Sequence, residues 1–363
     1  MLDTRDRTGK VGADRFVRIP IVGPGAIPIE SAATAAIVSV ISVEPCAAGF
    51  VTAFPCGGNR PLASVLNRTK DTVDAAAAVT NAAVVAIGDL ASICVYTSSP
   101  TDLVVDLTGY NGDGGDGADA GLLVAPVPPV RLVDTRPGNQ QILQLAQHRF
   151  VGGLTIDMST LSADPVEAVT INIVAVDPAA AGFVSAIPGA CTGAAPSTSV
   201  LNMASHRTAA ALTVTRIQDG HLCVYSNVET DLVVDLQAVL APRAELATVP
   251  VLPSRLYDSR TTTRLDAGVE RRITGLGVPG AAGAAINVTV VDPSSDGFVS
   301  MYPCGGDRPV ISNVNSGTGS ITANLTIVGL DASGAICAFS SSSTDLVIDA
   351  EAWLVPSLTP NTS

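Results

Sequence analysis

One arrangement of short motifs occurs three times along this chain of 363 residues, and this repetition constrains the fold more than any other feature. Each copy opens with Asp-Thr-Arg or Asp-Ser-Arg, continues through Gly-Phe-Val and a cysteine-containing strand, and closes with Thr-Asp-Leu-Val-(Val/Ile)-Asp. The repeat is about 120 residues long, the size of an ordinary domain. Because the order of motifs is always the same, the sequence predicts three tandem copies of one module.

The module boundaries follow from composition. Pro-rich stretches indicate short, stiff linkers, so the modules are predicted at residues 1–125, 126–248 and 249–363. An acidic, Gly-rich insert at residues 111–121 indicates a flexible, solvated linker. The first module begins inside its opening motif. This predicts that it is N-terminally truncated and that the chain is a piece of a longer secreted protein.

Short β-branched runs between turn signals indicate strands throughout. About eight strands per module suit a sandwich, and the low aromatic content of 4% implies a core of small and β-branched side chains. The predicted fold class is all-β, with three tandem β-sandwich modules of jelly-roll or immunoglobulin-like type. Separate beads and packing around a pseudo-threefold axis both remain open. Strands of the third module are predicted at residues 255–257, 269–273, 285–291, 297–302, 309–314, 321–328, 335–340 and 346–353.

Six of the seven cysteines recur as pairs at equivalent places in the modules. Paired recurrence is expected of disulfides, whereas zinc would need four ligands and a redox site would show Cys-x-x-Cys. The predicted disulfides imply an oxidising, extracellular compartment. The seventh cysteine, Cys46, is either a buried small hydrophobe or an intermolecular link. The predicted pairs are Cys56–Cys94, Cys191–Cys223 and Cys304–Cys337.

The opening and closing motifs contain the most conspicuous charged residues. An enzyme would use the aspartate as an acid or base and the arginine as an anion clamp. In the structural alternative, the Asp and Thr side chains hydrogen-bond backbone amides at a turn, and the arginine pairs with a carboxylate, for which the module-ending aspartate is a candidate. Three tandem copies favour the structural interpretation. The residues are Asp3, Arg5, Asp134, Arg136, Asp258 and Arg260, with Asp106, Asp235 and Asp349 at the module ends.

Other candidate chemistry is weak. The three histidines all lie in the second module, where a Ser-His-Asp triad stays open, but no Gly-x-Ser-x-Gly elbow, His-Glu-x-x-His or phosphate loop occurs. Calcium needs six to eight oxygens, more than the closing motif offers. Exposed aromatic candidates for glycan binding do not recur in all three modules. We therefore expect no catalytic residue, no metal and no cofactor. The aromatic candidates are Tyr110, Tyr257, Tyr302 and Trp353.

Charge and hydropathy exclude several classes of binding partner. The formal net charge of −13 argues against nucleic acid and anionic membrane surfaces. No apolar stretch is long enough for a transmembrane helix, so membrane insertion is not expected. The polar start, Met1–Lys10, is no signal peptide, and the predicted disulfides suggest that one has been removed.

Taken together, the motifs resemble a known family. Tandem modules with Leu-(Val/Tyr)-Asp-(Thr/Ser)-Arg, Gly-Phe-Val, Pro-Cys-Gly, Arg-Pro-Leu-Ala-Ser-x-Leu-Asn and Thr-Asp-Leu-Val-Val-Asp are similar to repeats in secreted and cell-surface proteins of high-GC Gram-positive bacteria. There they often accompany separate enzyme domains such as wall hydrolases or proteases. The resemblance covers the whole chain, although the second module departs at residues 187–191, where an insertion shifts the cysteine. It implies an accessory, surface-exposed role without a catalytic residue.

The sequence thus predicts a non-enzymatic extracellular or cell-surface protein with a structural, spacer or adhesive role. Its expected partners are cell-surface or cell-wall components, or other copies of itself. The alternative is a carbohydrate- or wall-binding array that targets a separate catalytic domain, because linked weak sites gain avidity.

Overall fold

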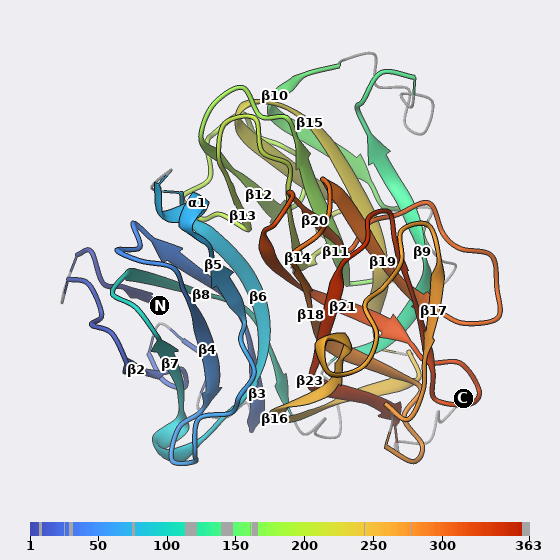
Figure 1. Ribbon diagram of the computed structural model, residues 1–363. Helices are drawn as coiled ribbons and strands as arrows, with labels where there is room; N and C mark the ends of the chain where they lie inside the picture. Colours follow the sequence, from blue (N-terminus) through green and yellow to red (C-terminus); the bar gives the residue numbers. More distant parts are fainter. Residues whose placement is uncertain are drawn as a thin grey trace.

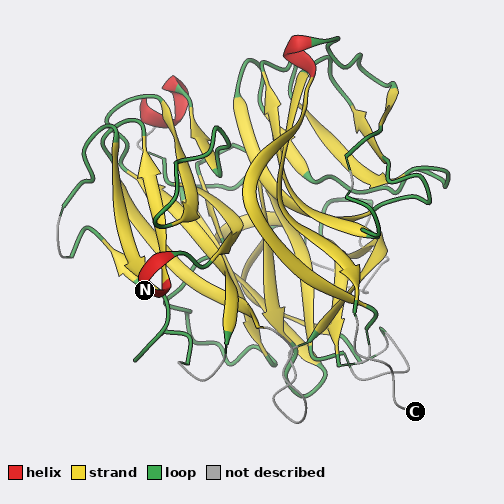
Figure 2. Ribbon diagram, turned by 90° about the horizontal axis from the view of Figure 1, so that it is seen from below, coloured by secondary structure: helices red, strands yellow, loops and turns green. Residues whose placement is uncertain are grey.

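The computed structural model is almost entirely β-structure, with short helical turns at α1 (Lys70–Asp74), η2 (Asp89–Ala91) and η4 (Ser259–Thr261) (Figure 2). Among the residues described, no helix is long and apolar enough to cross a membrane. The structure describes residues 1–6, 9–24, 26–28, 32–74, 77–112, 122–138, 148–159, 161, 166–242, 244–276 and 278–357.

Module 1 is a sandwich of two four-stranded antiparallel sheets. We call the sheet β1-β8-β3-β6 the inner sheet, because β6 lies at the centre of the molecule, and the sheet β2-β7-β4-β5 the outer sheet. Eight strands in this order form a jelly roll rather than an immunoglobulin-like sandwich. The bounds are β1 Leu2–Asp3, β2 Arg15–Pro20, β3 Ala33–Val43, β4 Gly49–Pro55, β5 Leu66–Arg68, β6 Val79–Ala86, β7 Ser92–Thr97 and β8 Asp102–Gly112.

Modules 2 and 3 repeat this order. In module 2 the long strand β15 serves both sheets, with β9, β11 and β14 in the inner sheet and β10, β12 and β13 in the outer sheet. In module 3 the inner sheet is β16-β23-β18-β21 and the outer sheet is β17-β22-β19-β20. The predicted fold class is therefore confirmed: all-β, with three β-sandwiches.

The strands of module 2 are β9 Leu123–Asp134, β10 Phe150–Asp157, β11 Ala168–Val176, β12 Gly182–Pro188, β13 Leu201–Met203, β14 Ala209–Arg216 and β15 His221–Ala241. Those of module 3 are β16 Leu246–Asp258, β17 Glu270–Ile273, β18 Gly283–Val291, β19 Gly297–Pro303, β20 Val314–Ser316, β21 Ile321–Gly329, β22 Ile336–Ser340 and β23 Asp345–Pro356.

Two details of the sequence interpretation are wrong. The Pro-rich boundary stretches are parts of strands β9 and β16, because proline is tolerated where a strand leaves its N–H unpaired. The strand expected at residues 309–314 begins only at Val314, and the segment before it is a loop after Pro309. The insert proposed as a linker lies, beyond Gly112, outside the described residues.

The three modules pack around a pseudo-threefold axis, which decides between the two arrangements left open by the sequence (Figure 1). The central strands β6, β14 and β21 contact one another, one from each module. Their outward faces join a shared apolar cluster that includes Val84, Leu212 and Leu325. This is why the inner strand β3 is buried on both faces and lacks the alternation of a half-exposed strand.

Two buried asparagines lock the central strands together. Asn81 on β6 accepts a hydrogen bond from the Leu325 backbone N–H on β21 and donates one to the Asn287 side chain on β18. Asn324, the equivalent residue on β21, makes the matching pair of bonds to β14 and β11 of module 2. Each amide is satisfied across a module boundary, as burial requires.

Two longer side chains cover the free edges of central strands. Glu351 on β23 accepts a hydrogen bond from the Val84 N–H on β6 at 2.7 Å. Gln237, its counterpart on β15, accepts one from the Ile327 N–H on β21 at 3.0 Å. Edge strands usually leave such N–H groups unpaired. Here the neighbouring module supplies the acceptor, and the free edge becomes an internal joint.

The junction between modules 1 and 2 is built differently. On β14, Ala211 takes the place of the bridging asparagine. Ser39 takes the place of its partner Asn287, and Thr108 takes the place of Glu351. The Ser39 hydroxyl is buried without a partner among the described residues. This junction instead has a bond from Asn202 to the Thr80 hydroxyl.

Candidate binding site on the pseudo-threefold axis

The Asp-Thr-Arg motif is a closed local turn. In module 2 the Asp134 carboxylate accepts the Arg136 backbone N–H and pairs with the Arg136 guanidinium at 2.6 Å. Modules 1 and 3 repeat both contacts. The expected pairing of Arg5, Arg136 and Arg260 with the module-ending aspartates is therefore wrong, because each arginine folds back onto the aspartate two residues before it.

The module-ending aspartates are held by other arginines. Arg131 bonds Asp235 at 2.6 Å and also Asp134 at 2.8 Å, and Arg255 does the same for Asp349 and its own opening motif. Burial raises the pKa of the Asp235 carboxyl, while the arginine acts in the opposite direction. Asp106 has no such arginine among the described residues.

The hydroxyl in the middle of the motif joins the two ends of each module. Thr135 donates to the Asp231 carboxylate at 3.0 Å and accepts the Leu232 N–H at 2.9 Å. Thr4 and Ser259 make the same two bonds in their modules. The motif and the closing signature thus form one joint, and the contacts described here bind them to each other rather than to an open site.

The three predicted disulfides are confirmed. Each links the segment after the Gly-Phe-Val strand to the neighbouring strand of the outer sheet, with Cα–Cα distances of 5.0 to 5.1 Å. The pairs are Cys56–Cys94, Cys191–Cys223 and Cys304–Cys337.

Cys46 is a free and exposed thiol, so its interpretation as a buried hydrophobe is wrong. Nearby, Arg68 is buried against the hydroxyls of Ser42, Thr97 and Ser99 and has no carboxylate partner among the described residues. Burial lowers the pKa of the Arg68 guanidinium to about 10.

The histidines of module 2 do not form a hydrolytic triad. In such a triad the imidazole stands between the hydroxyl and the carboxylate. Here Asp231 stands between the Thr135 hydroxyl and His148, which lies 3.0 Å from it. His206 bonds Asp177 at the surface. Among the described residues, no group of three or more His, Cys, Asp or Glu could hold a metal ion.

The aromatic side chains proposed as glycan-binding candidates differ in their exposure to solvent. Trp353 and Tyr302 are buried, whereas Tyr110 is exposed. A half-buried aromatic pair that the sequence interpretation missed does recur on every outer sheet. In modules 1 and 3 an arginine lies over it, as Arg60 does over Tyr96 at 4.2 Å. The pairs are Phe50–Tyr96, Phe183–Tyr225 and Phe298–Phe339.

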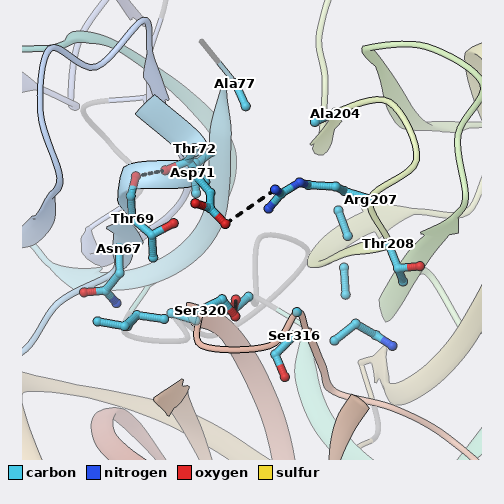
Figure 3. A pocket seen from close by; sticks show the side chains of 18 of the residues that line it. Asn67, Thr69, Asp71, Thr72, Ala77, Ala204, Arg207, Thr208, Ser316 and Ser320 are labelled. Carbon is cyan, nitrogen blue, oxygen red and sulfur yellow. Dashed lines mark hydrogen bonds and ion pairs between the residues drawn. The ribbon is translucent and has the colours of Figure 1, made fainter. Parts of the chain in front are cut away.

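A pocket of about 690 Å³ opens on the axis where the three central strands begin; we call it the axial pocket (Figure 3). Each module contributes the same asparagine from a short outer-sheet strand: Asn67, Asn202 and Asn315. Serines three residues earlier bond these amides and fix their orientation. Among the described residues, no hydrogen bond uses the Oδ1 atoms of Asn67 and Asn202.

One ion pair crosses the pocket. Asp71 of module 1 and Arg207 of module 2 approach to 3.5 Å from opposite walls (Figure 3). Both side chains are mostly exposed, so the pair contributes little to stability and can open at little cost. On the module 3 wall, two hydrogen bonds from Thr318 lower the pKa of the Asp296 carboxyl and keep it ionised.

The axial pocket offers amides, hydroxyls and backbone groups, with one aromatic wall at Phe298. Among its described residues, no hydroxyl is hydrogen-bonded to a histidine and no two carboxylates share a hydrogen-bond network. Such a lining suits recognition of a neutral polar ligand better than acid–base chemistry.

No signal in any single repeat reveals this pocket, because it exists only between modules. One clue was present: an asparagine in the middle of an apolar β-run, at both Asn81 and Asn324. A polar amide in a buried strand must find a partner, which points to an interface.

Three solved structures in the comparison with known proteins are distant likenesses of this chain. No protein family and no curated protein matches the sequence. A solved tandem of carbohydrate-binding modules from Paenibacillus barcinonensis Xyn10C is 10% identical over 64% of this chain and 99% of its own, with a TM-score of 0.20. A chain of the Sulfolobus Turreted Icosahedral Virus is 8% identical over 97% and 86%, with a TM-score of 0.22. A triple jelly-roll turret protein of an archaeal virus is 9% identical over 96% and 91%, with a TM-score of 0.17. At these scores the likenesses carry no argument about function.

Proposed function

We propose that the protein is a non-enzymatic extracellular adhesive protein whose axial pocket binds a carbohydrate of a cell surface or cell wall. The observation that carries this proposal is the lining of the pocket, where the asparagines Asn67, Asn202 and Asn315 and several Ser and Thr hydroxyls converge from three modules. Amide and hydroxyl groups of this kind recognise the hydroxyls of a sugar.

The charge of the protein supports this ligand class. A net charge of −13 disfavours nucleic acid and other polyanions, whereas a neutral glycan meets no repulsion. Among the described residues that line the pocket, Arg207 is the one Lys or Arg side chain, and it is paired with Asp71.

The packing of the modules favours adhesion over a spacer role. A spacer gains reach from modules placed end to end, whereas these modules lie side by side around an axis (Figure 1). The three disulfides support an oxidising, extracellular setting.

The test is binding of the purified protein to a glycan array and to isolated cell walls. Ala204→Trp fills the pocket from the module 2 wall, and Ala332→Trp is the matched control at an exposed site away from it. We expect wild type and the control to bind the same glycans, and Ala204→Trp to lose at least tenfold in affinity. Absence of binding to any glycan, wall or cell would contradict the proposal, as would equal binding by all three proteins.

A further inference from the structure

The aromatic pair on the outer sheet is covered by a cation in two modules and not in the third. The Arg60 guanidinium of module 1 lies 4.2 Å from the centroid of the Tyr96 ring, and that of Arg308 in module 3 lies 3.6 Å from the centroid of Phe339. The equivalent ring of module 2 belongs to Tyr225. Among the described residues, no Lys or Arg side chain lies over this ring.

Ala195 of module 2 stands at the position of the covering arginine. It precedes a proline, as Arg60 and Arg308 do, and an asparagine of the axial pocket follows seven residues later in every module. A hydroxyl of the neighbouring strand donates to the carbonyl three residues after this position in all three modules, so the backbone is held in the same way. Ala195 is exposed, and its methyl group has neither the length nor the charge of the guanidinium.

The edge strand of module 2 also has its smallest residue beside this ring. Gly153 lies opposite Tyr225, where module 1 has Phe16 and module 3 has Glu270. The Cys191 side chain of the disulfide packs closely against Gly153. Tyr225 stays partly exposed, so module 2 retains the aromatic surface without the side chain that covers it elsewhere.

We propose that Phe183 and Tyr225 of module 2 bind the guanidinium group of an arginine side chain that a partner protein presents. The centroids of the two rings lie 6.3 Å apart, and both rings are half-buried, like those that arginine covers in the other modules. Modules 1 and 3 show which group suits this aromatic pair. It is a planar cation, whose charge is attracted by the face of the ring and whose flat shape stacks on it.

The charge of the protein favours a basic partner. Its formal net charge of −13 attracts cationic molecules and repels anionic ones. A second copy of this chain meets like-charge repulsion, and a neutral glycan gains nothing from the charge. A separate basic protein is therefore the occupant that the observations favour.

The probe is the peptide acetyl-Gly-Arg-Gly-amide, titrated against the full chain. The same peptide with citrulline, the neutral counterpart of arginine, is the control. Because a single exposed cation–π contact is weak, binding is followed by NMR on the five tyrosines labelled with carbon-13. We expect the Tyr225 signal, assigned with Tyr225→Phe, to shift saturably with the arginine peptide. The citrulline peptide should bind at least tenfold more weakly.

Two variants exchange the covered and uncovered states. Ala195→Arg supplies the guanidinium from the chain itself and should weaken peptide binding at least tenfold, whereas the uncharged Ala195→Gln should bind as wild type does. Arg60→Ala uncovers Tyr96, whose signal should then respond to the arginine peptide as that of Tyr225 does. Ala195 and Arg60 are both exposed, so the variants are expected to fold, which circular dichroism checks.

Four results would overturn the proposal. They are no shift of the Tyr225 signal with the arginine peptide, equal binding of the citrulline peptide, full binding by Ala195→Arg, and a Tyr96 signal that stays unchanged in Arg60→Ala. Binding of a neutral glycan, in place of the peptide, that Ala195→Arg abolishes would assign the two rings to a sugar instead.

Discussion

At the scale of single residues, small hydroxyl groups hold each module closed. Thr135 lies buried at the start of module 2, and its one hydroxyl bonds the Asp231 carboxylate and the Leu232 backbone N–H at the end of the module. Removing it leaves the Leu232 N–H buried without its acceptor, while Asp231 keeps its bonds from His148 and the Arg149 N–H. An unpaired buried donor costs more than the net value of the bond itself.

Thr135→Val should therefore lower the free energy of unfolding by about 1–3 kcal/mol. Urea denaturation followed by circular dichroism measures the change. Thr135→Ser is the control, because Ser259 does the same work in module 3, and it should lie within about 1 kcal/mol of wild type. Equal stability of the valine and serine variants would contradict this role of the hydroxyl.

The sequence indicated that these motifs are structural, but not which residues pair. Arg131 and Arg255 lie three residues before the opening motifs of modules 2 and 3, and their spacing alone assigns them no partner. The role of Arg131 depends on the strand pairing of β9 with β15, which places it opposite Asp235. A pairing register of this kind is set by the whole sheet, so the motif alone could not reveal it.

At the scale of elements, the central strands are joined by side chains in place of a β-ladder. Glu351 covers the edge of β6 from the neighbouring module, in a wholly buried position. Burial raises the pKa of the Glu351 carboxyl to about 8, with Asp349 adding to the effect and the Val84 N–H opposing it.

This gives a pH dependence with a definite sign. Between the ordinary glutamate pKa of 4.5 and about 8, the folded protein retains a proton that the unfolded chain has released. Stability contributed by this group is complete below pH 4.5 and falls as pH rises to about 8. Glu351→Gln places the residue of module 2 at the same position and should remove that slope, with a gain of up to about 3 kcal/mol at pH 7.

Thermal unfolding of both proteins from pH 5 to pH 9 measures this difference. The two curves should converge toward low pH and separate as pH rises. A constant difference across the range would show that Glu351 does not hold the proton. Gln237→Glu is the converse variant and should introduce a slope at the junction of modules 2 and 3.

The strand runs of module 3 could be predicted because β-branched segments end at clear turn signals, as at Asp292-Pro293 after β18. The strand predicted at residues 309–314 is a loop up to Val314, in which Val310 is exposed and Ile311 is buried. Ile311 and Asn313 bond back onto β19 instead of entering a ladder.

At the scale of the whole molecule, three modules form one body with a shared apolar centre. A compact chain of this length should have a radius of gyration of about 21 Å. Small-angle scattering measures this value. Modules arranged as beads on a string would give a clearly larger radius and a longer maximum dimension. This arrangement could not be read from the repeats, since it depends on surfaces that become complementary only when three copies meet.

The three interfaces between modules are unequal, and this difference determines where local unfolding of the molecule starts. Two of them contain the buried amides of Asn81 and Asn324, whereas the third has Ala211. Local unfolding begins where the fewest buried contacts must be broken. In native-state hydrogen exchange, the β14 amides that face module 1 should therefore exchange faster than two other groups: the β6 amides that face module 3 and the β21 amides that face module 2. The interface between modules 1 and 2 would open first and would be the last to re-form.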